Sequence, residues 1–277
     1  MNRILIGSLL SLALAVPAAG QGTGGLLGDG GLVSLPTLLG GEVTVSFESV
    51  TGLTPANLGV STQLVSLLDP LLRARLPALV SIPAGFPVLV RIEPPAAGGL
   101  AFNGVASIEI RTAPLLSVLN LEDSLRIFAA PLGGSFEDIT SSIQRSTGSQ
   151  NRSLRALGTK GGFSEFLVVI DPLPLDLAIG AKLNRLDQIL AANAGAIPEA
   201  VAAELASELA AARSHSLPGD EAAAIQDLDT FLATVEQHSG TDIPDVWRAA
   251  RDRVNVAGLL RAGAQTLQFS LRLRQDH

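Results

Sequence analysis

Apolar and polar residues alternate one by one from Glu42 onward, with Val43, Val45 and Phe47 forming the apolar set. This period of two is typical of a strand that buries one face. Similar short segments follow, each ended by glycine or proline, at 86–92, 104–112, 124–128 and 136–143. Short strands at this spacing predict an antiparallel β-sandwich over residues 42–171.

The sandwich is expected to close with the apolar run 163–170, which Gly161 and Gly162 precede and Asp171-Pro172 follows. Glycine and proline at its two ends are typical of a strand between turns. After Pro172-Leu173-Pro174 the apolar spacing changes from two residues to three or four, which is the spacing of one face of a helix. This joint therefore divides the chain into a strand half and a helical half.

Four amphipathic helices are predicted in the second half. Their apolar stripes are Ile179, Leu183, Leu186 and Leu190; Val201, Leu205, Leu209 and Ala212; Ile225, Leu228, Leu232 and Val235; and Trp247, Ala250, Val254 and Ala257 in a helix expected to open at Pro244. Short connections between such helices predict an antiparallel bundle over residues 175–277. The predicted fold class is α+β.

The first 20 residues have the pattern of a secretory signal: Arg3, an apolar stretch, and small residues at 17–20. We expect export to the periplasm or the extracellular space, with no membrane-spanning segment once the signal is removed. Residues 21–41 are rich in glycine and are expected to form a linker, because glycine loses the most backbone freedom on ordering.

Charge and cysteine content narrow the possible functions. The net charge is −7, only 16% of residues are charged, and Lys160 and Lys182 are the two lysines, so nucleic acid is not an expected partner. The chain has no cysteine, which excludes disulfides, thiol nucleophiles and cysteine-ligated metals. With one tryptophan, no tyrosine and 4% aromatic residues, it also lacks the stacking surfaces that carbohydrate sites use.

No residue pattern supports a catalytic, cofactor or metal site. His215, His238 and His277 lie in no zinc-binding frame, and His238 is expected to face the last carbonyls of its helix. The acidic pairs Glu122-Asp123 and Glu137-Asp138 are adjacent on strands, so the two side chains of each pair are expected to diverge. Ser164 is expected to point outward from its strand, in a structural role.

Two resemblances to known families are present. Segments 127–142 and 163–169, with Gly134-Ser135-Phe136-Glu137-Asp138-Ile139-Thr140 at their centre, resemble strands of β-sandwich modules in bacterial exported proteins. Residues 203–262, above all Phe231, Val235, Gly240 and Ile243, resemble the FIMAH helical module of bacterial secreted proteins. These resemblances imply an extracellular setting and a non-catalytic accessory role.

We therefore expect a secreted or surface-associated interaction protein, without enzymatic activity, whose partner is an unidentified protein or part of the cell envelope. Two alternatives remain open. One is an extracellular hydrolase built from scattered carboxylates, and the other is a protein that binds an apolar ligand through the leucine-rich stretch Leu64–Val80.

Overall fold

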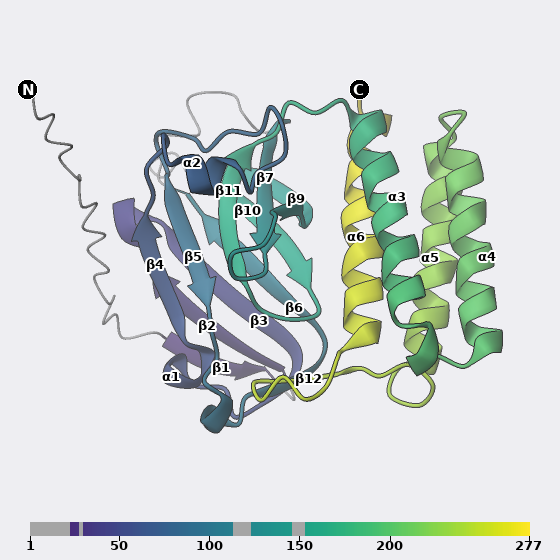
Figure 1. Ribbon diagram of the computed structural model, residues 1–277, viewed down its shortest axis with the longest axis horizontal. Coiled ribbons are helices and arrows are strands. Elements are labelled where there is room, and N and C mark those ends of the chain that lie inside the picture. The colour runs from purple at the N-terminus through teal and green to yellow at the C-terminus, as the bar shows by residue number, and fades with distance from the viewer. Residues whose placement is uncertain (1–22, 28–29, 113–122, 146–152) are drawn as a thin grey trace, which may run out of the picture.

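A computed structural model describes residues 23–27, 30–112, 123–145 and 153–277 (Figure 1). The expected signal segment, residues 1–20, lies outside these residues. The described chain forms two antiparallel sheets followed by helices, which confirms the predicted α+β class.

The first sheet is antiparallel and has 7 strands in the described part of the chain. Its strands in spatial order are β1 (Thr23–Leu27), β2 (Gly30–Pro36), β3 (Glu42–Thr51), β6 (Ala101–Arg111), β10 (Leu154–Lys160) and β9 (Thr140–Arg145), and β12 (Val246–Arg248) also pairs with β6. The register of β3 and β6 sets Val45 opposite Ile108 and Val43 opposite Ile110, with all four side chains buried. The predicted alternation along β3 is confirmed.

The second sheet has 5 described strands. In spatial order they are β4 (Val60–Leu64), β5 (Val88–Ile92), β11 (Glu165–Ile170), β7 (Leu125–Ala130) and β8 (Glu137–Asp138). One face of this sheet shares a core with the first sheet, where Val90, Ile127 and Phe166 pack among residues of β3 and β6. Its other face buries Phe128 and Leu167 under the segment that contains α2 (Pro70–Arg73).

The strand predicted at 163–170 is β11, the central strand of the second sheet, and its charged residue is buried. Glu165 is 1% exposed and accepts hydrogen bonds from Arg75 and Arg91, with Arg91 Nη2 at 2.6 Å from Oε1. Burial raises the pKa of Glu165, but the hydrogen bonds from Arg91 and Arg75 outweigh it and hold the pKa below its usual value. Glu165 therefore stays ionised inside the fold.

The glycine-rich segment 21–41 contains strands instead of the expected linker. Strand β2 pairs with β3 along its whole length, from Gly31 opposite Phe47 to Pro36 opposite Glu42. The buried Val33 meets Val45 across this pair and contributes to the shared core. Burial of the apolar residues between the glycines thus offsets the backbone entropy that the glycines lose on ordering.

The helical half contains α3 (Leu175–Ala192), α4 (Glu199–Ser216), α5 (Glu221–His238) and α6 (Val256–Gln275), and a single-turn helix α1 (Pro55–Leu58) lies before β4. Successive long helices run in opposite directions (Figure 1). The predicted stripes of α3 and α4 are buried throughout, and Leu228 and Val235 of α5 are buried with them. No described helix is long and apolar enough to cross a bilayer.

The fourth helix begins later than predicted. Residues 246–248 form β12 on the edge of β6, with Trp247 opposite Phe102 and its ring stacked on Phe102 at 5.3 Å between centroids. Helix α6 starts only at Val256, and Val254 is 56% exposed instead of inward. The apolar residue Trp247 therefore packs on the sheet and not in the helical core, which is why the helical spacing misled.

Helix α6 joins the two halves. It packs on β6, β9 and β10 of the first sheet and also on α3 and α5. Glycines permit this approach: a Cβ on Gly161 would lie 2.6 Å from the Leu259 nitrogen, and one on Gly258 would lie 2.3 Å from the Gly104 oxygen. Strands and helices thus meet along α6 with backbone close to backbone.

Candidate functional site

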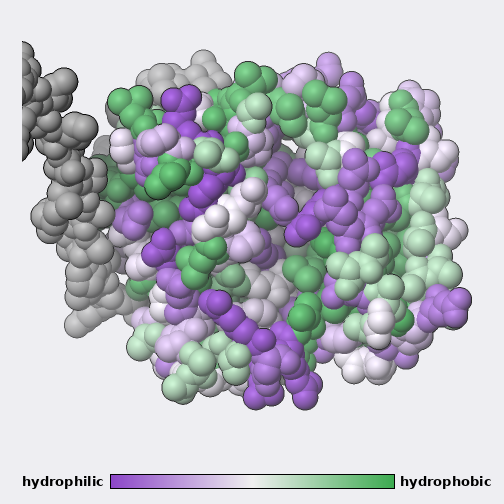
Figure 2. Space-filling view, in the orientation of Figure 1, coloured by the Kyte–Doolittle hydropathy of each residue, from purple (hydrophilic) through white to green (hydrophobic). Residues whose placement is uncertain are grey.

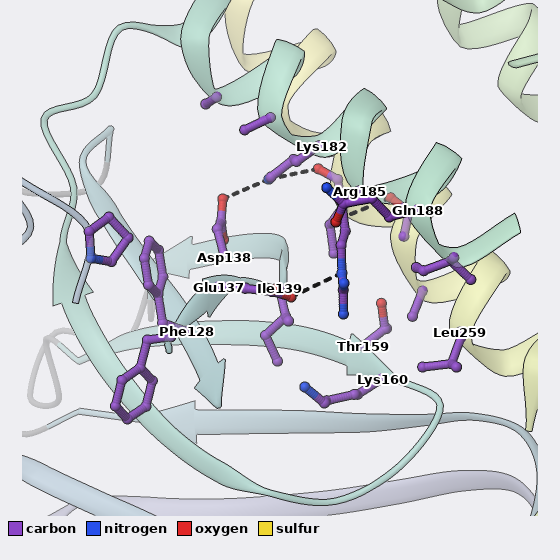
Figure 3. A pocket seen from close by; sticks show the side chains of 18 of the residues that line it. Phe128, Glu137, Asp138, Ile139, Thr159, Lys160, Lys182, Arg185, Gln188 and Leu259 are labelled. Carbon is purple, nitrogen blue, oxygen red and sulfur yellow. Dashed lines mark hydrogen bonds and ion pairs between the residues drawn. The ribbon is translucent and has the colours of Figure 1, made fainter. Parts of the chain in front are cut away.

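A cavity of 340 Å³ lies where the strands meet the helices. Strands β7 and β8, the end of β10, and helices α3 and α6 supply its walls, as Figure 3 shows. In the space-filling view the boundary between sheets and helices is hollowed, with hydrophilic residues beside the hollow (Figure 2). The apolar part of the lining consists chiefly of Phe128, Phe136, Ile139, Leu173, Ile189 and Leu259.

One polar wall is built around Lys182 of α3. Its Nζ lies 2.6 Å from Asp138 Oδ2 and donates to the Thr266 carbonyl at 3.0 Å and to Ser270 Oγ at 2.8 Å. These three acceptors satisfy all three ammonium protons. Burial lowers the pKa of Lys182, and Asp138 opposes that shift. Lys182 therefore ties β8 to α3 and α6 and has no proton to offer a ligand.

Glu137, the neighbour of Asp138, is also engaged. Its Oε2 lies 3.1 Å from Nε of Arg185, one turn further along α3 (Figure 3). The expectation that Glu137 and Asp138 diverge is wrong, since both line the same cavity. Strand β8 is only two residues long and lies at the sheet edge, so the regular alternation of a longer strand does not hold there.

Lys160 is the exception among the basic residues of the cavity. It is the last residue of β10, and its Nζ makes no hydrogen bond or ion pair with any residue that the structure describes. Burial lowers the pKa of Lys160 to about 8, the charge of Glu137 opposes this shift, and the charge of Arg185 adds to it. Beside it, the hydroxyl of Thr159 is buried without a partner.

Asp171 closes the cavity at the end of β11. It is 8% exposed, and Oδ1 accepts a hydrogen bond from the Leu173 nitrogen at 2.9 Å. Burial raises the pKa of Asp171, while the charges of Arg126 and Lys182 act in the opposite direction. Arg126 is itself buried, and its charge only partly offsets the shift, so the pKa of Asp171 stays raised.

Among the described basic residues that line the cavity, Lys160 alone has no partner. Asp138 is paired with Lys182 and Glu137 with Arg185. The half-buried amine of Lys160 has no acceptor from the described protein, and an anionic ligand would supply one. The cavity can therefore hold an apolar body with one acidic group next to Lys160.

The histidines considered in the sequence lie elsewhere. His215 pairs with Asp227 at 2.6 Å, and His277 lies 4.0 Å from Asp123. His238 Nδ1 lies 2.6 Å from Asp242, not on the helix carbonyls as expected. No group of metal-ligating side chains occurs among the residues placed by the structure. Glu122 of the other acidic pair lies outside the described residues.

Ser164 does not point outward. It is 4% exposed, and its Oγ is buried without a hydrogen-bond partner. The residue lies just before β11, a strand that is buried on both faces, so alternation there does not turn a side chain toward solvent.

The leucine-rich stretch Leu64–Val80 is not the apolar cavity. Only Pro77 of this stretch lines the cavity, and several of its leucines face outward. Leu68 is 80% exposed, Leu71 is 78% and Leu79 is 74%. This stretch instead covers one face of the second sheet through residues such as Leu72 and Leu76.

Fold and cavity together define the class of this protein: an α+β protein whose two antiparallel sheets meet four long helices at a largely apolar cavity. The chain belongs to a family of unknown function (DUF6689), whose model matches residues 11–275. The match includes both the strands and the helices. A comparison with curated proteins gives no match.

Proposed function

We propose that this protein binds a small, largely apolar molecule that carries one acidic group, such as a carboxylate. The observation that supports this function is the unpaired Nζ of Lys160 in a cavity whose other basic side chains are paired. A carboxylate beside Lys160 would form a charge-assisted hydrogen bond with an amine that has no acceptor among the described residues.

The dimensions and lining fit this class of ligand. Ligand cavities are typically about 300–1,000 Å³, apolar for the most part, with a few polar groups that fix orientation. The 340 Å³ cavity lies at the lower end of that range, with Phe128 and Phe136 on one side and Leu259 near Lys160. A medium-chain fatty acid or an aromatic acid is therefore a better fit than a large ligand.

The contacts of the carboxylates in the cavity favour ligand binding over hydrolysis as its function. A general acid or base must be free to exchange a proton with the substrate. Asp138 and Glu137 are both held by basic side chains of α3, and Asp171 already accepts a backbone hydrogen bond. The hydrolase alternative therefore has no free carboxylate pair in this cavity.

The test is titration calorimetry of the full chain with octanoate, octanol and octylamine. Octanoate is expected to bind at least about tenfold more tightly than octanol, since a charge-assisted hydrogen bond contributes more than 1.4 kcal/mol. Lys160→Met should remove this preference, and Lys160→Arg should keep part of it. Arg73→Met is the matched control, because Arg73 is an unpaired cation that lines no described cavity.

Equal affinity for octanoate and octanol in the unsubstituted protein would contradict the proposal. So would an octanoate preference that survives in Lys160→Met. Either result would show that the amine does not select the ligand.

We also propose that the protein acts after export, as a periplasmic or extracellular accessory protein without catalytic activity. The basis is the signal-like pattern of residues 1–20 and the resemblance of residues 203–262 to the FIMAH module. The same proposal treats the two sheets as a β-sandwich of the kind found in bacterial exported proteins. Amino-terminal sequencing of the protein recovered outside the cytoplasm tests it; an intact Met1 would contradict cleavage.

An interaction role is the second candidate function, and the exposed leucines of segment 64–79 favour it. Leu68, just before α2, and Leu71, within it, are both more than three-quarters exposed, and clustered exposed leucines often mark contact surfaces. A photo-crosslinking amino acid at Leu68 should then capture a specific partner in intact cells, while the same probe at the exposed Val254 should not. Identical crosslinks from both positions would contradict this role.

A further inference from the structure

A second cavity of 340 Å³ lies on the other side of the β10–β11 turn. The turn Gly161–Gly162, the residue Ser164 and the loop before α6 form its walls. Arg251 and Arg253 of that loop line it, as does Trp247 of β12. Lys160 lines both cavities, but Arg251, Arg253 and Ser164 line only this one.

The arginines of this cavity are unpaired. Neither Arg251 nor Arg253 makes a side-chain hydrogen bond or ion pair with any residue that the structure describes. Asp252 between them is engaged by Arg248 at 3.2 Å, and Glu93, the acidic residue of the lining, lies 3.6 Å from Arg91. The chain has a net charge of −7, yet basic side chains line this cavity. The acidic residues Asp252 and Glu93 beside them are paired with other arginines.

Lys160 is the third unpaired cation of this lining. Its Nζ makes no hydrogen bond or ion pair with any residue that the structure describes. Ammonium and guanidinium groups are donors only, so three of them around one cavity favour a ligand made of acceptors. Ser164 also lines the cavity, but its Oγ is buried behind the wall and cannot be reached from the cavity.

We propose that this cavity binds a tetrahedral oxyanion of two negative charges, as found in phosphate or sulfate groups. Guanidinium groups match the spacing of two oxygens on such an anion and bind them in pairs. Lys160 adds positive charge at the edge shared with the first cavity. The inference does not rest on the proposed function, because Arg251 and Arg253, which carry it, do not line the first cavity.

The experiment is calorimetric titration of the full chain with inorganic phosphate, with sulfate and with phenyl phosphate, at constant ionic strength. We expect saturable binding of at least one of these anions. The double variant Arg251→Ala with Arg253→Ala should weaken that binding at least tenfold, since two charge-assisted contacts are lost.

Two controls separate the possible outcomes. Arg73→Ala removes another unpaired arginine outside the cavity and should leave anion binding unchanged, and far-ultraviolet circular dichroism should show that every variant is folded. Tighter binding of phenyl phosphate than of inorganic phosphate would assign an organic ester as the ligand, and the reverse would assign the free anion. Absence of saturable binding, or equal binding by the double variant, would overturn the proposal.

The two proposals can fail separately. An octanoate preference that is lost in Lys160→Met, without saturable binding of any of the three anions, would leave only the first cavity's ligand assignment standing. Phosphate binding that depends on Arg251 and Arg253, without any octanoate preference, would leave the oxyanion site standing alone.

Discussion

The side chain of Asn255 bonds the first turn of α6 and the sheet at the same time. Its Oδ1 accepts a hydrogen bond from the Gly258 nitrogen at 2.7 Å, and its Nδ2 donates to the Gly104 carbonyl of β6 at 2.6 Å. Asn255 is 1% exposed, so water cannot replace either bond. One amide therefore caps the helix and fixes where the helix starts on the sheet.

Asn255→Ala should lower the free energy of unfolding by about 2–4 kcal/mol, because a cap contributes about 1 kcal/mol and a buried carbonyl loses its donor as well. Asp220→Ala is the matched control: Asp220 caps α5 through the Ala223 nitrogen at 3.1 Å but is exposed and contacts no strand. It should cost only about 1 kcal/mol. Urea unfolding of both variants checks this, and equal losses would contradict a second role for Asn255.

Lys182→Met should destabilise the protein by about 3–5 kcal/mol, because it leaves Asp138 without its cation at a buried position. Adding Asp138→Asn should recover part of the loss, since an amide does not carry the charge that needs the lysine. Thermal unfolding of the two single variants and the double variant forms the required cycle. Simple addition of the two single effects would show that the pair is not coupled.

Gly161→Ala and Gly180→Ala are expected to have opposite effects. A methyl group at Gly161 would lie 2.6 Å from the Leu259 nitrogen, so α6 would have to move away from the β10 end at a cost of about 1–3 kcal/mol. Gly180 lies inside α3 with nothing within 4 Å of an added Cβ, and alanine there should stabilise by roughly 0.5–1 kcal/mol. Differential scanning calorimetry measures both, and a stabilising Gly161→Ala would contradict the close approach.

Lys160→Met should stabilise the protein at neutral pH while it removes octanoate selectivity. Burial lowers the pKa of Lys160 from 10.5 to about 8, so below pH 8 the charged amine destabilises the folded state relative to methionine by about 1–3 kcal/mol. Between pH 8 and 10.5 the unfolded chain binds the proton more readily than the folded chain, so the stability of the unsubstituted protein rises relative to the variant. Urea unfolding at several pH values checks this; a constant difference would contradict the pKa shift.

The strand half and the long helices follow from local patterns. The alternation at Val43, Val45 and Phe47 and the stripe from Ile179 to Leu190 each depend on neighbours in sequence, so periodicity predicts them well. Strand β12 is different, because Trp247 pairs with Phe102, which lies far away in the sequence. No local pattern indicates such a pairing, and an apolar residue near Pro244 fits a helix start equally well.

The candidate site was beyond prediction for a related reason. In the sequence Lys160 is one of two lysines, and nothing next to it shows whether it has a partner. Its isolation depends on Glu137 being held by Arg185 and on Asp138 being held by Lys182, which are contacts between separate strands and α3. The gathering of Arg251, Arg253 and Lys160 around the second cavity is likewise visible only once α6 and its preceding loop are in place.

Trp247 is the only tryptophan of a chain without tyrosine, and it stacks on Phe102 while lining the second cavity. Its indole nitrogen also lies against Gly162, at the turn that both cavities share. Near-ultraviolet emission of this protein therefore originates from a single indole at the place where strands, helices and cavities converge. Any event there can be followed optically without attaching a dye.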